Sequence, residues 1–182
     1  MLVVGPRRAW IFSGVEVRYV SESLREVTTI LHYFDPNLFC AQLESRTKDD
    51  VLRELTDRLV QGAGVKDPDL LYDMLKRRES LGSTGIGKGV AIPHGRSLAV
   101  NELRVLFARS SAGVEFESMD KKPVHLFFLI VAPPQDKRNE YLPLLGRIAE
   151  LVKEKKVRDK LQACETFEDL ADLLEGKFGA VE

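Results

Sequence analysis

One of the chain's three histidines, His94, stands in a setting suited to nucleophilic chemistry. It follows Pro93, precedes Gly95 and comes directly after residues 90–92, a short apolar segment that predicts a strand. The imidazole is therefore expected at a strand end, with little bulk on one side. The reference pKa of histidine is about 6.5, so a neutral ring is available at neutral pH and can attack phosphorus to form a phosphohistidine.

Phosphoryl transfer asks a protein for positioning and for donors to the phosphoryl oxygens. Residues 82–89 include four glycines and are expected to form a loop, since such a segment sustains neither helix nor strand well. Close backbone N–H groups and hydroxyls in this loop can bind phosphate. The candidates are Ser83, Thr84, Gly85 and Gly87. At the end of the preceding helix, Arg78 or Arg77 can supply a planar guanidinium that pairs with phosphate oxygens.

The segment from Glu79 to Gly95 resembles, position by position, the phosphohistidine signature of the type-2 enzyme IIA family of bacterial phosphotransferase systems. That family contains fructose, mannitol and nitrogen-regulatory members. Its signature has an acidic or amide residue, an apolar-glycine pair, and then apolar-Ala-apolar-Pro-His-small. Glu79, Ile86-Gly87 and residues 90–95 supply these positions. The wider similarity runs from about residue 29 to residue 178.

The resemblance implies roles for three residues. His94 is the phosphoryl acceptor, and Arg78 matches the arginine that steadies the phosphoryl group. Many members have a second histidine near the start of a later helix, where this chain has Tyr141. A phenol can donate a hydrogen bond to phosphate but cannot carry positive charge.

The resemblance also implies a fold and partners. The family fold is an α/β three-layer sandwich, a mixed β-sheet flanked by helices on both faces. The expected activity is that of a phosphotransferase, with a phospho-HPr-type carrier protein as donor. An enzyme IIB domain or a regulatory target protein is the expected recipient. No metal or organic cofactor is expected for a histidine-to-histidine exchange. The partner interface should surround His94, with Ile86 and Ile92 as apolar neighbours.

Three functions are compatible with these residues. The chain lacks an enzyme IIB-like cysteine motif, and its Gly-Ser-Thr-Gly-Ile-Gly loop resembles the nitrogen-regulatory branch, so we favour a phosphorylation-dependent regulator. The first alternative is a fructose- or mannitol-type uptake component that passes phosphate to an enzyme IIB. The second is an interaction module that has lost transfer, an alternative kept open by Tyr141.

Other interpretations of the reactive residues are weaker. Gly82-x-x-x-x-Gly87-Lys88 resembles the start of a P-loop, but Gly89 stands where a magnesium-binding Ser or Thr belongs. His32 and His125 show no metal-ligand spacing with His94, and both are expected to be structural. Cys40 and Cys164 are expected to be reduced, buried thiols.

Periodic apolar patterns predict the elements that position these residues. Strands are expected at residues 38–43, 90–92, 104–108 and 124–131. Helices are expected at residues 51–60 with Thr47 as N-cap, from Asp67-Pro68 to Glu79, and at 139–151, 157–163 and 167–174, the last capped by Thr166. Helices interleaved with strands favour an α/β sandwich.

Residues 1–33 differ in pattern from the rest and are expected to be an N-terminal extension of unknown role, with a short strand at 15–19 and a helix at 23–33. Residues 34–180 are expected to form the phosphocarrier domain.

The composition argues against two classes of partner. With 27 basic and 28 acidic side chains the net charge is −1, which gives no general attraction to nucleic acid or to an anionic membrane. The longest apolar run, residues 126–132, is far shorter than the roughly 20 residues of a membrane span. No signal peptide is recognisable, so a cytoplasmic location is expected. The sequence does not specify an oligomeric state.

Overall fold

The computed structural model describes residues 30–65 and 67–178. The strand expected at residues 15–19 and most of the helix expected at 23–33 lie outside them. The end of that helix is instead a 3₁₀ turn, η1 (Leu31–Tyr33), after which the chain enters the first strand.

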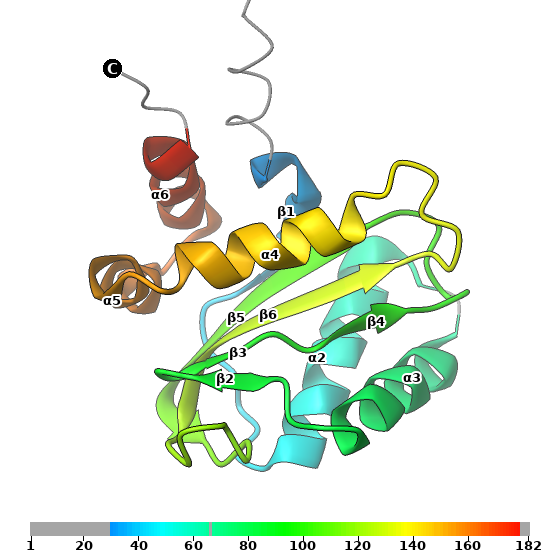
Figure 1. The fold of residues 1–182 in the computed structure, drawn as a ribbon, viewed down its shortest axis with the longest axis horizontal. Helices are drawn as coiled ribbons and strands as arrows, with labels where there is room; N and C mark the ends of the chain where they lie inside the picture. Colours follow the sequence, from blue (N-terminus) through cyan, green and yellow to red (C-terminus); the bar gives the residue numbers. More distant parts are fainter. Residues whose placement is uncertain (1–29, 66, 179–182) are drawn as a thin grey trace, which may run out of the picture.

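A mixed six-stranded sheet forms the middle layer of the molecule (Figure 1). In chain order its strands are β1 (Phe34–Cys40), β2 (Gly85–Gly87), β3 (Val90–Ala91), β4 (His94–Arg96), β5 (Arg104–Val114) and β6 (Val124–Ala132). The strand β5 lies between β1, which is parallel to it, and β6, which is antiparallel. On the other side of β6, both β3 and β4 run parallel to it, and β2 pairs antiparallel with β3.

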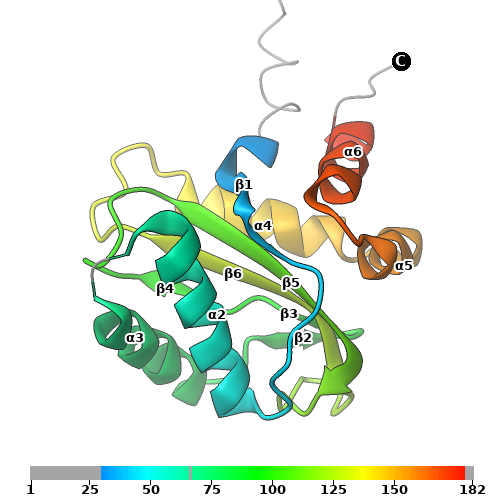
Figure 2. The same ribbon diagram turned by 180° about the vertical axis from the view of Figure 1, so that it is seen from behind.

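Helices cover both faces of this sheet. One face carries α2 (Lys48–Ala63) and α3 (Pro68–Ser80), which lie in front of the sheet in Figure 2. The other face carries α4 (Tyr141–Leu151), α5 (Lys155–Ala163) and α6 (Phe167–Phe178). The predicted three-layer α/β sandwich is confirmed. In the described ranges, no helix has the length and apolar character needed to cross a membrane.

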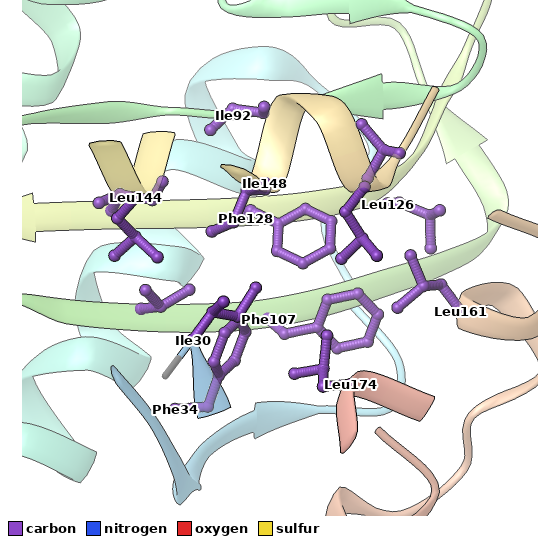
Figure 3. Packing of buried hydrophobic residues seen from close by; sticks show 14 of the residues in the cluster. Ile30, Phe34, Ile92, Phe107, Leu126, Phe128, Leu144, Ile148, Leu161 and Leu174 are labelled. Atoms are coloured by element: carbon purple, nitrogen blue, oxygen red, sulfur yellow. The ribbon is translucent and has the colours of Figure 1, made fainter. Parts of the chain in front are cut away.

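The sheet separates two apolar cores. Along β6, Phe128 and Ile130 point toward the α4–α6 layer, whereas Phe127 and Leu129 point toward α2 and α3. Figure 3 shows the first core, in which the rings of Phe107 and Phe128 have centroids 5.0 Å apart. Because both faces are covered, the strand is apolar at almost every position, which explains the apolar run seen in the sequence.

The packed region extends into the expected N-terminal extension. Ile30 is only 1% exposed and belongs to the core shown in Figure 3, where it lies beside Phe34. Packing of the described chain therefore begins before residue 34.

Helix starts are the features that the sequence predicted best. The Thr47 hydroxyl accepts the Asp50 N–H, which confirms the predicted N-cap. The helix predicted to open at Asp67-Pro68 does so, and the Asp67 carboxylate caps it by accepting the Leu70 N–H. The Thr166 cap is also present, accepting the Asp169 N–H. Strand bounds were less accurate: β1 begins and ends earlier than residues 38–43, and β5 continues well past residue 108.

The prediction that residues 82–89 form only a loop is wrong. Residues Gly85–Gly87 form β2, which folds back on β3 as a hairpin. The two connecting residues, Lys88 and Gly89, both have positive φ, 56° and 76°, as a two-residue hairpin turn requires. Contacts from a distant loop hold the strand in place: the Ser118 hydroxyl accepts the Gly87 N–H, and the Gly85 carbonyl accepts the Met119 N–H.

Candidate functional site

His94 is the first residue of β4, where the chain resumes pairing with β6 after a break. Along the same side of β6, Val90 pairs with Leu126 and His94 pairs with Ile130. Pro93 interrupts the ladder between them because it has no N–H, although its carbonyl still accepts the Ile130 N–H at 2.9 Å. The break separates β3 from β4 and places His94 where residues of α3 and α4 can reach it.

Gly95 lets α3 pack closely against this strand. A Cβ atom at this position would lie 1.9 Å from Sδ of Met74 on α3. Any larger residue would have to push the helix or the Met74 side chain aside. The small residue after the histidine therefore leaves room for the Met74 side chain between α3 and β4.

The imidazole of His94 is held by a different group at each ring nitrogen. Nδ1 lies 2.6 Å from the Ile92 carbonyl oxygen. A carbonyl can only accept, so Nδ1 carries the proton. Nε2 lies 3.2 Å from Nε of Arg78, whose N–H donates to it. These contacts assign the neutral Nδ1–H tautomer and leave the reactive lone pair on Nε2.

The surroundings also keep this ring neutral. Burial lowers the pKa of His94 below its ordinary value of 6.5, and the positive charge of Arg78 lowers it further. The hydrogen bond to the Ile92 carbonyl and the charge of Glu79 act in the opposite direction without reversing the shift. At pH 7 the ring is therefore predominantly in its nucleophilic form.

This pKa shift predicts the pH dependence of phosphoryl acceptance. Protonation places a hydrogen on Nε2 and removes its lone pair, so the rate should fall only below a midpoint lower than 6.5 and stay flat above it. The check is the initial rate of His94 phosphorylation across pH at saturating donor, with an NMR titration of the ring. An Arg78→Ala variant should move the midpoint upward, because it removes a charge that disfavours imidazolium. A wild-type midpoint above 6.5 would contradict this reading.

Of the two arginines considered from the sequence, Arg78 is the one at the site. It lies in the last turn of α3, and its Nη1 donates to the Gly82 carbonyl at 3.1 Å while its Nε meets His94. Arg77 is exposed to solvent. Arg78 is thus anchored at one end of its guanidinium fork and meets the nucleophile with another of its N–H groups.

Tyr141 approaches His94 from the other layer. It is the first residue of α4 and is 6% exposed, and its ring centroid lies 6.3 Å from that of the imidazole. Its backbone N–H donates to the Asp136 carboxylate at 2.9 Å, which orients the start of the helix. Burial raises the pKa of the phenol, so Tyr141 is a neutral donor at physiological pH.

A residue that the sequence analysis missed, Arg96, lies against the ring of Tyr141. Its guanidinium carbon is 4.9 Å from the Tyr141 ring centroid, and its Nη1 donates to the Pro134 carbonyl at 3.1 Å. The sequence spacing could have identified Arg96: it lies two residues after His94 on a strand, so the two side chains project from the same face of the sheet. The site therefore has one cation, Arg78, at His94 and a second, Arg96, at Tyr141.

The four loop candidates are engaged with other protein groups. Glu79 accepts both the N–H and the hydroxyl of Thr84, and the Ser83 hydroxyl donates to the Phe116 carbonyl. The N–H groups of Gly85 and Gly87 donate to the hydroxyls of Ser83 and Ser118. The structure brings Arg78 and Tyr141 to His94 but uses these loop donors to hold the hairpin.

Three further expectations are decided by burial and topology. Ile92 is 2% exposed and packs in the core, so it cannot be an apolar neighbour on a partner surface; Ile86, 40% exposed, can. The glycine-rich segment follows a helix and leads into a strand, the reverse of a P-loop. Cys40 and Cys164 are buried free thiols, as predicted.

Comparisons with known proteins agree with this geometry. The family model described as phosphoenolpyruvate-dependent sugar phosphotransferase system, EIIA 2, matches residues 32–177. A nitrogen regulatory protein of Bradyrhizobium diazoefficiens is 36% identical over 128 residues, which is 70% of this chain and 82% of that protein. The fructose-specific EIIA component of Haloferax volcanii is 33% identical over 149 residues, 82% of this chain and 96% of that protein.

A solved structure and a longer relative complete the comparison. The crystal structure of the nitrogen regulatory protein IIA-Ntr from Neisseria meningitidis superimposes with a TM-score of 0.73 at 30% identity, covering 80% of this chain and 98% of that one. The chain spans only 21% of the fructose-specific EIIABC component of Bacillus subtilis, to which 72% of it aligns at 33% identity. Because the family model accounts for most of the chain, the protein belongs to the type-2 EIIA family of the phosphoenolpyruvate-dependent sugar phosphotransferase system.

Proposed function

We propose that the protein is a phosphocarrier that accepts a phosphoryl group on Nε2 of His94 and passes it to another protein. One observation carries the proposal, the hydrogen bonding of the His94 ring. Nδ1 lies 2.6 Å from the Ile92 carbonyl oxygen, which holds the proton there, and Nε2 lies 3.2 Å from Nε of Arg78. Phosphoryl acceptance needs a nitrogen lone pair close to a guanidinium, because the arginine stabilises the negative charge of the incoming phosphoryl oxygens.

The exchange balances between two histidines. The Nε2 lone pair attacks phosphorus on the phosphohistidine of an HPr-type donor, the donor's N–P bond breaks, and its electron pair returns to the donor's ring nitrogen. His94 keeps its Nδ1 proton, so its phosphorylated ring is positively charged and donates more strongly to the Ile92 carbonyl. No proton has to be gained or lost, and the same geometry serves the reverse step.

Tyr141 supports the phosphorylated state in this proposal. Its phenol lies in the same site as the imidazole and is neutral, so it can donate a hydrogen bond to the phosphoryl group. Arg96, whose guanidinium carbon lies 4.9 Å from the Tyr141 ring centroid, adds positive charge that the tyrosine itself lacks. Together they take the place of the second histidine found in many family members.

A Tyr141→Phe variant measures this contribution. A hydrogen bond to a charged group contributes about 1.5–3 kcal/mol, so loss of the phenol should slow acceptance or speed loss of the phosphoryl group by about tenfold or more. Phosphorylation and dephosphorylation rates of the two proteins give the answer, with near-identical Tm as the fold control. Equal rates would mean that the phenol does not touch the phosphoryl group.

The test of the proposed function is intact-protein mass after incubation with phosphoenolpyruvate, enzyme I and HPr. We expect one phosphoryl group per chain, lost in acid and stable in base. A type-2 IIA protein of known activity serves as positive control in the same mixture. If the control is labelled and this protein is not, the non-transferring interaction module becomes the leading function.

Regulation is the version of this function that we favour, and uptake is the second candidate. Nitrogen regulatory relatives support the first, and the similarity to a fructose-specific EIIA component supports the second. Phosphorylation adds about −1.5 to −2 charges, enough to change which proteins bind the surface around His94. Three exposed leucines lie within three residues of Arg78, Arg96 or Tyr141 in the chain, and we expect them to contribute to that docking surface: Leu81, Leu98 and Leu142.

Onward transfer separates the two candidates. The phosphorylated protein, freed of donor, is mixed with a fructose-type IIB domain and with buffer alone. Rapid transfer of the label to the IIB cysteine would favour uptake. A label retained as long as in buffer would favour regulation, with the recipient then sought among proteins that bind only one phosphorylation state.

A further inference from the structure

A buried carboxylate, Glu79, lies next to the arginine of the site in the last turn of α3. It is 6% exposed, and Nζ of Lys48 lies 2.9 Å from its Oε1. Its two oxygens also accept the Thr84 N–H at 3.0 and 3.1 Å and the Thr84 hydroxyl at 2.6 Å. Because the Glu79 carboxylate is buried and accepts three hydrogen bonds from Thr84, it fixes the position of Thr84.

From Thr84 an unbroken series of hydrogen bonds leads to the nucleophile. The Thr84 carbonyl accepts the Ile92 N–H at 3.0 Å. The Ile92 carbonyl in turn accepts the Nδ1 proton of His94 at 2.6 Å. Each bond sets the orientation of the next peptide, so the position of the Glu79 carboxylate determines where the acceptor for the imidazole proton points.

We propose that Glu79, held by Lys48, is a positioning residue that selects the Nδ1–H tautomer of His94 through Thr84 and Ile92. The proposal rests on the proposed function, because only an acceptor at Nε2 needs the proton on Nδ1. In free histidine the Nε2–H tautomer predominates, so the protein itself must stabilise the Nδ1–H tautomer. Without it, the proton would occupy the nitrogen that faces Arg78, and the nucleophile would be lost.

The Lys48 end of the network explains how a buried carboxylate is tolerated there. The ammonium also meets the Glu117 carboxylate at 2.9 Å and lies 5.2 Å from the Phe116 ring centroid. Lys48 therefore connects the start of α2 and the 116–117 segment to the end of α3. An uncompensated buried carboxylate would be costly, so this ion pair offsets the burial of Glu79, whose oxygens accept the Thr84 bonds.

The test is a direct measurement of the tautomer in the unphosphorylated protein. Long-range ¹H–¹⁵N correlation spectra of the His94 ring are compared for wild type, Glu79→Ala and Glu79→Gln, together with phosphorylation rates. A matched control is Glu54→Ala: that carboxylate also accepts two backbone N–H groups, of Glu44 and Ser45, and pairs with a cation, Arg58. It has no link to His94 in the series described above.

We expect Glu79→Ala to shift the ring toward Nε2–H and to lower the acceptance rate by about 10²-fold, the scale of a misplaced reacting group. Glu79→Gln keeps one oxygen for Thr84 and should retain most of the Nδ1–H signal. Glu54→Ala should keep the wild-type tautomer and rate even where its Tm drops.

Two outcomes would overturn the proposal. One is a folded Glu79→Ala protein with the wild-type Nδ1–H spectrum, whatever its rate; the other is an equal tautomer shift in Glu54→Ala. If Glu79→Ala does not fold, Thr84→Val removes only the 2.6 Å hydroxyl bond and is judged by the same spectrum. A wild-type protein that takes no phosphoryl group would end the proposed function, while the tautomer comparison would still decide the role of Glu79.

Discussion

A His94→Ala variant is expected to take up no phosphoryl group, a loss of at least about 10³-fold in rate, while keeping its fold. The side chain is half-buried at an edge of the sheet rather than in either apolar core, so its removal should change Tm by only a few degrees. Intact mass after incubation with the donor proteins measures the label. Circular dichroism shows whether the variant is folded.

Among residues 30–65 and 67–178, the other candidate nucleophiles are poorly suited to replace the lost imidazole. Burial raises the pKa of both cysteines, Cys40 and Cys164, so they are neutral thiols, and it raises the pKa of the Tyr141 phenol. His125 has its Nδ1 engaged by the Ser110 carbonyl at 2.9 Å. A His125→Gln variant is the matched control and should be labelled like wild type. Label on His94→Ala, or loss of label in His125→Gln alone, would show that the acceptor has been misassigned.

What the sequence predicted well is local chemistry. Three features depend on residues a few positions apart: the starts of α2 after Thr47 and of α3 at Asp67-Pro68, the apolar stripes of these helices, and the histidine after a short strand. The resemblance to a known signature added the pairing of Arg78 with His94, whose atoms the structure brings to 3.2 Å. Periodicity alone could not have chosen Arg78 over Arg77.

The sequence predicted poorly whatever depends on contacts between distant segments. The glycine-rich segment becomes a strand because Ser118 and Met119, more than thirty residues later, hydrogen-bond to it. In the same segment, the N–H and the hydroxyl of Thr84, two donors expected to bind phosphate, bond to the buried carboxylate of Glu79. Arg96 reaches Tyr141 only because the start of α4 lies across β4. None of these relations has a signature within one local window.

An Arg78→Ala variant is expected to accept the phosphoryl group about 10²–10³-fold more slowly than wild type, the scale seen when one preorganised donor to developing charge is removed. The Arg78 guanidinium has two roles. Its Nε–H donates to His94 Nε2 across 3.2 Å and so orients the lone pair, and its positive charge stabilises the negative charge of the arriving phosphoryl oxygens. Arg78→Lys keeps the charge but loses the planar fork that also binds the Gly82 carbonyl, so its rate should lie between the two.

Arg77→Ala is the matched control for this prediction, because Arg77 is the neighbouring residue of the same helix turn, has the same charge and is exposed to solvent. Both variants lose one positive charge near the docking surface, so any general weakening of donor binding should affect them equally. A high donor concentration overcomes weaker donor binding but not a slower transfer step. Rates measured over a range of donor concentrations therefore separate the two effects. We expect Arg77→Ala to approach the wild-type maximal rate and Arg78→Ala to stay far below it. Equal maximal rates in the two variants would mean that Arg78 contributes only general charge, and that the contact with Nε2 has no part in the transfer.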